Sequence, residues 1–366
     1  FPATPEGKPQ PVGWTLVSGL RKVLETELKD LVTVRTKSSF KELLRDEDGQ
    51  VVGLRLEDET GPQELHGTVV LTSGGYANDH SDKSLLEQHT PALAKLPTTN
   101  GPFATGDIIK ALVHQDLGVK TTLMDKVQIH PTGFIEVKQP NFHTKFLAPE
   151  ALRGSGGILL CHGQRFANEL GRRDYLTDKM FQHCKPLFDK EENPLAAAML
   201  LTEEAVEKYG KGAMGFYKFK GLVQDVGSIE AAAEAMGANE AVLRKTLDDY
   251  NEAAEKGVDE FGKKVFPVRF PSSAHLYVAF VTPTLHYCMG GLAINPRAEV
   301  LSSSGDALPG LFGAGEVTGG VHGNNRLGGN SLLECAVFGR LAGQNAAERA
   351  IKETRCDTDR GSHGGA

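Results

Sequence analysis

The stretch "GGVHGNNRLGGNSLLE" (319–334) sets several glycines around His322 and Arg326, directly before an apolar run. Glycine loses more backbone freedom on folding than any other residue, so a cluster of this kind marks a strained turn or a close approach of backbone to a ligand. An arginine fork fits a carboxylate through two parallel hydrogen bonds. The stretch therefore predicts an anion site, with a surface ion pair of Arg326 as the alternative.

The apolar run after the glycines predicts a helix that starts at Leu332. Ser331 and Glu334 have the spacing of a capping box, in which each side chain bonds a backbone N–H of the other residue. The free N–H groups at such a helix start suit a phosphate or a polarised flavin ring. A simple tight turn into a core helix is the alternative.

Upstream, the patterns predict a helix over 14–29, a strand at 31–36 and a hairpin in "FKELLRDEDGQVVGLRLED" (40–58). "GTVVLTSGGY" (67–76) reads as a buried parallel strand ending on two glycines. This order resembles the later part of a dinucleotide-binding domain. No strand is followed by G-x-G-x-x-G and a helix, so either no dinucleotide binds or the first β-α-β unit lies upstream of Phe1.

The sequence changes character from Val127 to Pro283, with scattered strands and a strongly helical stretch at 239–257. We expect an α/β fold: an N-terminally incomplete Rossmann-like domain interrupted by an inserted α+β domain. The expected boundaries are 1–126 for the first part of the Rossmann-like domain, 127–283 for the inserted domain, 284–352 for the C-terminal segment of the Rossmann-like domain and 353–366 for a polar tail.

Composition excludes several classes of protein. The 366 residues include no apolar run near the roughly 18 that a membrane span needs. A net charge of −7 argues against nucleic acid as the main partner. No metal site is expected, because the five cysteines are widely spread and form no C-x-x-C. They indicate a reduced, intracellular compartment in which each has a structural or incidental role.

Six motifs, in this order, resemble the fumarate reductase and succinate dehydrogenase flavoprotein family, with the soluble fumarate reductases as the nearest branch. They are "ATGDIIKAL" (104–112), "VQIHPTGF" (127–134), "EALRGSGGILL" (150–160), "GQRFANELGRRD" (163–174), "LHYCMGGLAI" (285–294) and "GAGEVTGGVHGNNRLGGNSLLECAVFGRLAGQNA" (313–346). The resemblance spans nearly all of residues 15–350 and implies an FAD cofactor. It also implies that the Rossmann-like domain is an FAD-binding domain and that the inserted α+β domain is a capping domain.

The resemblance also implies roles for single residues. Arg173 matches the arginine that delivers a proton, and Glu150 and Arg153 match its relay. The residues matching those that hold the two substrate carboxylates are His130, His286 and Arg326. The residues matching positions that contact FAD are Asp107, Glu316, Ser331 and Leu332. Pro149 departs from the family, since many members have a threonine there that touches the substrate.

These residue types suit a flat dianion such as fumarate, with Arg326 and His286 at one carboxylate and His130 at the other. We therefore expect a fumarate reductase that takes electrons from a domain or partner outside this chain. The alternatives are another enzyme of the family, such as an L-aspartate oxidase or a different enoate reductase, and a truncated, inactive remnant. Related soluble enzymes occur in mitochondria, peroxisome-like organelles and bacterial periplasm.

Overall fold

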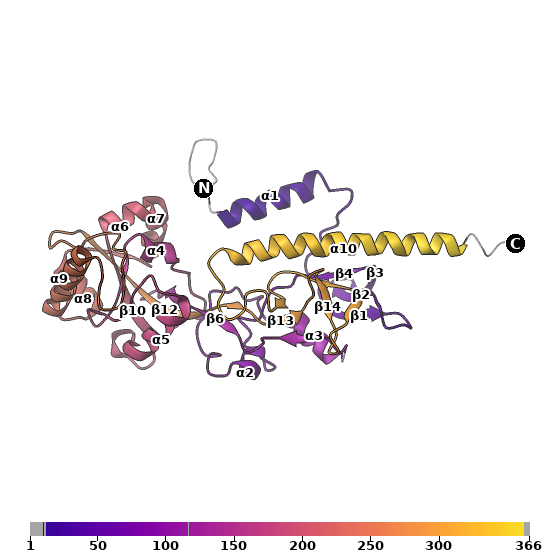
Figure 1. The fold of residues 1–366 in the computed structure, drawn as a ribbon, viewed down its shortest axis with the longest axis horizontal. Coiled ribbons are helices and arrows are strands. Elements are labelled where there is room, and N and C mark those ends of the chain that lie inside the picture. Colours follow the sequence, from indigo (N-terminus) through magenta and orange to yellow (C-terminus); the bar gives the residue numbers. More distant parts are fainter. Residues whose placement is uncertain (1–9, 11, 116, 362–366) are drawn as a thin grey trace. The chain divides into compact units, whose positions relative to one another are not determined.

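The structure is a computed structural model that describes residues 10, 12–115 and 117–361. Its contacts divide the chain into two compact units, with boundaries at 44/45, 52/53 and 66/67. The smaller unit holds one helix and most of one sheet, and the larger unit holds the remaining elements (Figure 1).

The smaller unit consists of α1 (Val12–Thr26) and a sheet of β1 (Ser39–Arg45), β2 (Val51–Asp58) and β3 (Gly61–His66) in that order. The predicted hairpin is confirmed: the Asp46 N–H donates to the Gln50 carbonyl at 3.1 Å, and Gly49 has φ +79° in the turn between β1 and β2. Glycine adopts this left-handed conformation without the steric penalty of a Cβ. β3 extends the hairpin as an antiparallel third strand.

One of the two other expectations for this unit differs from the structure. The predicted strand at 31–36 is absent, and its Leu31 and Val34 side chains are exposed. Alternation of apolar residues is not enough, because a strand also needs a partner for its backbone hydrogen bonds. The predicted helix is confirmed as α1, but no described residue of α1 is buried, so Leu16 and Leu20 contact no core.

The larger unit contains a seven-stranded sheet with helices around it (Figure 1). The strand path is β11 (Gln224–Gly227), β12 (Leu276–Cys288), β10 (Leu195–Thr202), β7 (Ile158–Cys161) and β8 (Gln164–Arg165). β6 (Val127–Phe134) pairs with β12, and β9 (Lys185–Pro186) pairs with β10. The associated helices are α4 (Glu150–Gly154), α5 (Arg173–His183), η1 (Leu187–Asp189), α6 (Glu203–Tyr209), α7 (Lys211–Phe219), α8 (Ile229–Met236) and α9 (Glu240–Lys256).

This sheet supplies the largest core of the chain, with β10 and β12 buried along nearly their whole length. The predicted helix at 239–257 is confirmed as α9. Asn239 caps its start by accepting from the N–H of Ala241 at 2.9 Å, and Gly257 ends it with φ +79°.

Two smaller three-stranded sheets follow the orders β16 (Thr318–Gly319), β13 (Gly291–Ala293), β5 (Thr121–Thr122) and β14 (Glu299–Leu301), β15 (Ala307–Gly313), β4 (Val69–Leu71). β4 pairs in parallel with β15, as "GTVVLTSGGY" predicts. The expected continuous burial is wrong at Val70, which is exposed between two buried neighbours. α2 (Leu85–His89) and α3 (Asp107–His114) complete the described elements.

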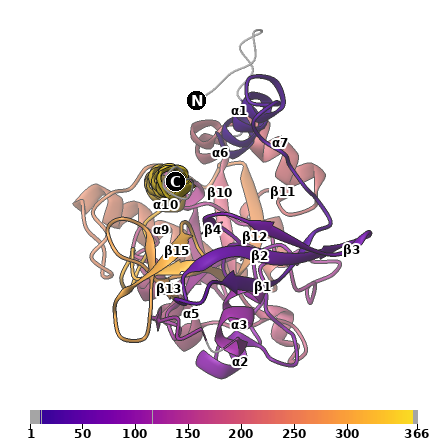
Figure 2. The same cartoon turned by 90° about the vertical axis from the view of Figure 1, so that its right-hand side faces the viewer.

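The C-terminal helix α10 (Asn330–Gly361) starts two residues before the predicted Leu332. It packs on β15 through Ala342 and Phe338, which meet Phe312, and Figure 2 shows the helix end-on. Residues 353–361 of the predicted tail belong to α10. Residues 353–360 include no glycine or proline, so nothing in their sequence ends the helix before Gly361. The rest of the predicted tail, 362–366, lies outside the described residues.

The domain boundaries remain predictions, and β12 runs through the one expected at 283/284. The reduced state expected of the cysteines is wrong for Cys161 and Cys184, which form a disulfide between the end of β7 and the residue after α5. Their wide spacing in sequence hid the proximity that the fold creates. In the described part of the chain, no helix is long and apolar enough to cross a membrane.

Candidate active site

The two predicted substrate histidines come from neighbouring strands. His130 on β6 lies opposite Thr284 of β12, and the register shifts between Leu285 and Tyr287, which leaves His286 as the extra residue of a β-bulge. A bulge changes the direction of a side chain relative to a regular strand. The rings of His130 and His286 consequently lie 5.2 Å apart between centroids, in an edge-to-face arrangement.

Both histidines are neutral near pH 7. Burial lowers the pKa of His130 to about 4, and its Nδ1 accepts a hydrogen bond from the Thr132 N–H at 3.2 Å. This contact places the ring proton of the neutral form on Nε2. Burial also lowers the pKa of His286 far below its usual value, helped by the charges of Arg173 and Arg326. The Nδ1 of His286 lies 2.7 Å from the Thr99 hydroxyl.

Glu150 and Arg173 meet at the starts of two helices, α4 and α5. Both Nε and Nη2 of Arg173 lie 2.5 Å from Oε1 of Glu150, and His130 Nε2 lies 3.5 Å from the same oxygen. Burial acts to raise the pKa of Glu150, but the contacts with His130 and Arg173 outweigh it and hold that pKa well below its usual value. Glu150 is therefore a carboxylate, with 43% of its side chain exposed.

Arg153 lies one turn after Glu150 on α4 and is buried. Its Nη1 donates to the Glu169 carbonyl at 2.6 Å, whereas its Nε and Nη2 have no hydrogen-bond partner. Burial lowers the pKa of Arg153 to about 10. The Glu169 carboxylate is in turn held by Arg165 at 2.7 Å and Lys263 at 2.8 Å, so these charges form a buried network rather than a solvated surface.

Arg326 is 5% exposed and lies in the glycine-rich turn before α10. Its backbone N–H donates to Gln128 at 3.2 Å, and its Nη1 donates to the carbonyl of Leu327 at 3.2 Å. The guanidinium lies 4.4 Å above the ring of Tyr287. Burial lowers the pKa of Arg326, followed by the charge of Arg173.

Gly328 brings this turn against the Glu150–Arg173 pair. A Cβ at Gly328 would lie 3.8 Å from Arg173 Nη2 and 3.9 Å from Glu150 Oε2, so the turn passes directly beside the pair. The structure thus brings together five of the predicted residues: His130, Glu150, Arg173, His286 and Arg326. Arg153 lies on the same helix as Glu150.

Three buried donors of this cluster have no hydrogen-bond partner: His130 Nε2, Arg173 Nη1 and Arg326 Nε. The 3.5 Å separation between His130 and Glu150 is too long and poorly aligned for a good hydrogen bond. Buried polar groups are nearly always paired, so these donors indicate an acceptor that is not part of the chain. Two cationic arginines among them favour an anionic acceptor.

The four predicted FAD contacts lie in different surroundings. Glu316 is half-buried, accepts from the Cys288 N–H at 2.8 Å, and has a pKa raised by desolvation to about 7. Ser331 and Leu332 lie in the first turn of α10, whose early N–H groups have no partner within the helix. Asp107, at the start of α3, is 81% exposed and lies 3.7 Å from Lys110 Nζ.

The predicted capping box is wrong. Ser331 lies inside α10, and the Glu334 carboxylate bonds His322 at 2.8 Å and the hydroxyl of Tyr287. Glu334 therefore does not cap the helix start. A glycine pair at 328 and 329, the first N–H groups of a helix, which lack partners within it, and the exposed Leu332 side chain fit the mixed polar and apolar surface of a flavin.

Four residues of the site are missed by sequence reasoning: Thr99, Gln128, Tyr287 and Glu334. Thr99 and Gln128 carry no signal, because they reach the site only through strand pairing and loop placement. Glu334 does carry one, since a carboxylate inside an apolar helical run must find a partner when buried.

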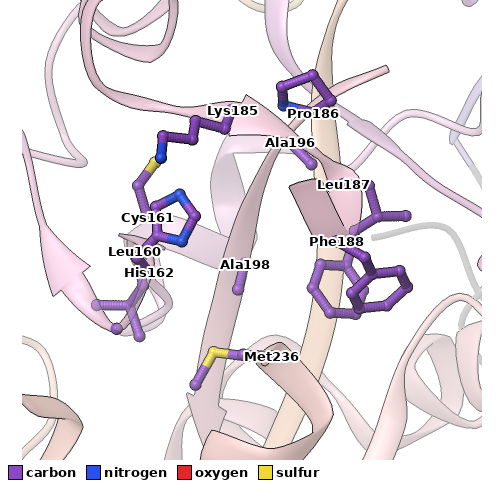
Figure 3. A pocket seen from close by; sticks show the side chains of 12 residues that line it. Leu160, Cys161, His162, Lys185, Pro186, Leu187, Phe188, Ala196, Ala198 and Met236 are labelled. Atoms are coloured by element: carbon purple, nitrogen blue, oxygen red, sulfur yellow. The ribbon is translucent and has the colours of Figure 1, made fainter. Parts of the chain in front are cut away.

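A separate hollow of about 40 Å³ lies in the seven-stranded sheet region (Figure 3). It is lined by Cys161, His162, Lys185, Phe188, Ala198 and Met236, among others. It has room for a few water molecules at most and contains none of the predicted site residues. It is therefore not the candidate active site.

Comparison with known proteins supports the flavin assignment. The profile of the FAD binding domain family matches residues 4–332. The chain is 44% identical over 293 residues to a fumarate reductase of Schizosaccharomyces pombe, covering 79% of this chain and 54% of the relative. It is 38% identical over 351 residues to fumarate reductase 1 of Saccharomyces cerevisiae, covering 92% of this chain and 72% of the relative.

Among solved structures, the chain is similar to the open conformation of a flavocytochrome c3 fumarate reductase, with a TM-score of 0.72 and 32% identity. That match covers 94% of this chain and 57% of the other. The chain thus spans about half the length of the Schizosaccharomyces pombe relative and of this solved structure.

Proposed function

The chain belongs to the FAD binding domain family of flavoproteins, and on this basis we propose that it is the catalytic part of an FAD-dependent fumarate reductase, which converts fumarate to succinate. The observation that carries the proposal is the set of unpartnered, buried donors on His130, Arg173 and Arg326. A dicarboxylate supplies the acceptors that these donors lack.

Substrate binding is assigned to Arg326, His286 and His130. The guanidinium fork of Arg326 would hold one carboxylate, with His286 beside it, and His130 Nε2 would donate to the other carboxylate. The two histidines are neutral, so each provides a hydrogen bond without adding a charge. Donors fixed where negative charge develops lower the barrier, by about 3 to 4 kcal/mol for a well-placed donor.

FAD, when bound, supplies the hydride that adds to one alkene carbon. Arg173 would give a proton from its guanidinium to the other carbon, so that fumarate, one hydride and one proton yield succinate. The unpartnered Nη1 of Arg173 supports this role, because that nitrogen is free to face the substrate. The carbanion that forms is basic enough to take a proton even from an arginine.

Glu150 and Arg153 would return the proton to Arg173. The charge of Arg173 is one of the factors that keep the Glu150 pKa low. When Arg173 has lost its proton, that factor disappears, and burial then raises the proton affinity of Glu150. Glu150 can therefore take up a proton, which its exposed fraction makes accessible from solvent, and pass it across the 2.5 Å contact. Arg153 would support this transfer as a second cation of lowered pKa.

Asp107, Glu316, Ser331 and Leu332 are the residues proposed to hold FAD, and the electrons would come from a domain or partner outside this chain. An intracellular location is also part of the proposal. Disulfides are rare in reducing compartments, so the state of Cys161 and Cys184 in protein purified from its own cells tests the location. Reduced thiols would support a reducing intracellular compartment, whereas the disulfide seen in the structure would indicate an oxidising one.

The test of the function is anaerobic oxidation of a reduced viologen dye by the FAD-loaded protein when fumarate is added. Rapid bleaching with fumarate, and not with L-aspartate or acrylate, would support a site selective for an unsaturated dianion. Bound flavin without bleaching would point to another substrate. A protein without bound flavin would show no absorbance at wavelengths longer than those of the protein band. That result would favour an inactive remnant.

A further inference from the structure

Among the residues that the structure describes, no carboxylate forms an ion pair with Arg326, and its Nε has no hydrogen-bond acceptor. A direct ion pair would occupy the donors that the substrate needs. Instead, the guanidinium lies 4.4 Å above the ring of Tyr287, which attracts the cation without using any N–H group.

The hydroxyl end of Tyr287 is itself fixed by a carboxylate. Its hydroxyl donates to Oε2 of Glu334, and the same oxygen lies 2.8 Å from His322 Nε2. The His322 ring also packs edge-on against the Tyr287 ring, with centroids 5.4 Å apart. Glu334 is 3% exposed, so this network is shielded from water. His322, which the sequence suggests as an anion ligand, instead supports the ring beneath Arg326.

The Glu334 carboxylate lies at the hydroxyl end of the Tyr287 ring, and Arg326 lies above the face of the same ring. A phenol that donates to a carboxylate gains electron density, which makes its ring face more attractive to a cation. The guanidinium is thus held over the ring without using its N–H groups, and its Nε has no acceptor. A substrate carboxylate can then accept from Nε and a neighbouring N–H of the guanidinium through two parallel hydrogen bonds.

We propose that Tyr287 and Glu334 are positioning residues that orient Arg326 for the substrate carboxylate, with His322 as the third member of the network. This inference rests on the proposed function, because it assumes that Arg326 binds a dicarboxylate. It assigns no contact with substrate to Tyr287 or Glu334. Their substitution should therefore weaken dicarboxylate binding through Arg326 and leave the chemical step largely unchanged.

The test measures the dissociation constant of succinate by calorimetry on FAD-loaded protein, together with KM and kcat for fumarate. Tyr287→Leu, which removes the ring, should weaken succinate binding by about 2- to 30-fold. Tyr287→Phe and Glu334→Gln, which keep the ring but remove the hydroxyl or the charge, should weaken it by a smaller factor. KM should rise in step, with kcat within about twofold of wild type.

A matched control lies on the same strand. Tyr277 of β12 donates its hydroxyl to Glu203 and has Lys218 Nζ 5.1 Å from its ring centroid, but none of these residues is part of the candidate site. Tyr277→Phe should therefore leave succinate affinity unchanged. A double-mutant cycle gives the decisive comparison: Tyr287→Phe should have little further effect in the Arg326→Lys background, because both changes act through one contact.

The outcomes separate the two proposals. Wild-type protein that binds no dicarboxylate would overturn the proposed function and this inference together. Normal wild-type binding with unchanged affinity in Tyr287→Phe and Glu334→Gln would overturn the inference alone. A fully additive effect of Tyr287→Phe and Arg326→Lys would also overturn it. If Tyr287→Leu fails to fold, the two milder variants decide the question.

Discussion

Arg173 and Glu150 share a single carboxylate oxygen: both Nε and Nη2 of Arg173 lie 2.5 Å from Oε1 of Glu150. This geometry leaves Nη1 as the nitrogen without a partner. Glu150 thus binds one side of the guanidinium and leaves the other side for a ligand. The relationship joins the first residues of α4 and α5, which are separated by 23 positions in sequence.

The first prediction concerns proton delivery. Arg173→Ala should lower kcat for fumarate reduction by about 10²- to 10⁴-fold, the usual contribution of a general acid, while flavin absorbance stays the same. Dye oxidation and flavin spectra measure both. Arg172→Ala is the matched control, because the neighbouring Arg172 is exposed and pairs with Asp174. Retained turnover in Arg173→Ala would refute the assigned role.

The second prediction concerns the relay. Glu150→Gln keeps a similar shape but cannot carry a proton between solvent and Arg173, so we expect kcat to fall by about 10²-fold or more. KM for fumarate should change much less than kcat. Steady-state kinetics on the FAD-loaded variant measure both quantities. A rise in KM with normal kcat would instead show that Glu150 only helps to bind substrate.

The third prediction concerns pH and Glu316. Desolvation raises the pKa of the half-buried Glu316 carboxyl from about 4.5 to about 7, so the folded state holds more protons than the unfolded state between these values. Its contribution to stability is therefore full below about pH 4.5 and falls as pH rises through 7, by about 3 kcal/mol in total.

Urea unfolding of the flavin-free protein at several pH values measures this effect. Glu316→Gln should be more stable than wild type at pH 8, and the two proteins should approach each other at pH 5. His130 and His286 act in the opposite direction, since their lowered pKa values reduce stability as pH falls below about 6.5. Both proteins contain these histidines, so their effect cancels in the difference between the two unfolding free energies. A pH-independent difference would contradict the assignment.

The fourth prediction concerns the buried ion network behind Arg153. Lys263 and Glu169 are both fully buried and lie 2.8 Å apart. Lys263→Met leaves Glu169 with one cation fewer, and breaking a buried pair in this way costs about 3 to 5 kcal/mol of unfolding free energy. Lys264→Met is the control, because the adjacent lysine is exposed and should change stability by less than about 0.5 kcal/mol. Equal effects of the two variants would contradict the structure.

The fifth prediction concerns the disulfide. Alkylation of unreduced protein followed by mass spectrometry should leave Cys161 and Cys184 unlabelled, and label Cys335 readily. The bridge closes a loop across 23 positions, so Cys161→Ala should lower the unfolding free energy by about 3 kcal/mol. Cys335→Ala should have little effect. Labelling of both Cys161 and Cys184 without reductant would refute the bridge.

The sequence alone predicts several local elements because their signals are local. The hairpin at 40–58 follows from alternation around a glycine turn, and α9 follows from helical periodicity between Asn239 and Gly257. Prediction from sequence fails at 31–36, where apolar residues alternate but no neighbouring strand provides hydrogen bonds. It also fails at Ser331, because Glu334 finds stronger partners in Tyr287 and His322 than the helix backbone offers.

The sequence by itself determined the flavoprotein family and the identity of the charged and imidazole side chains, since these are carried by short motifs in a fixed order. Only the tertiary structure decided their arrangement. A bulge in β12 sets the position of His286 near His130. The turn at Gly328 passes beside Arg173 and Glu150, and the ring of Tyr287 lies beneath Arg326, so segments far apart in the chain meet. Contacts of this kind depend on strand pairing and helix placement, which local sequence patterns do not encode.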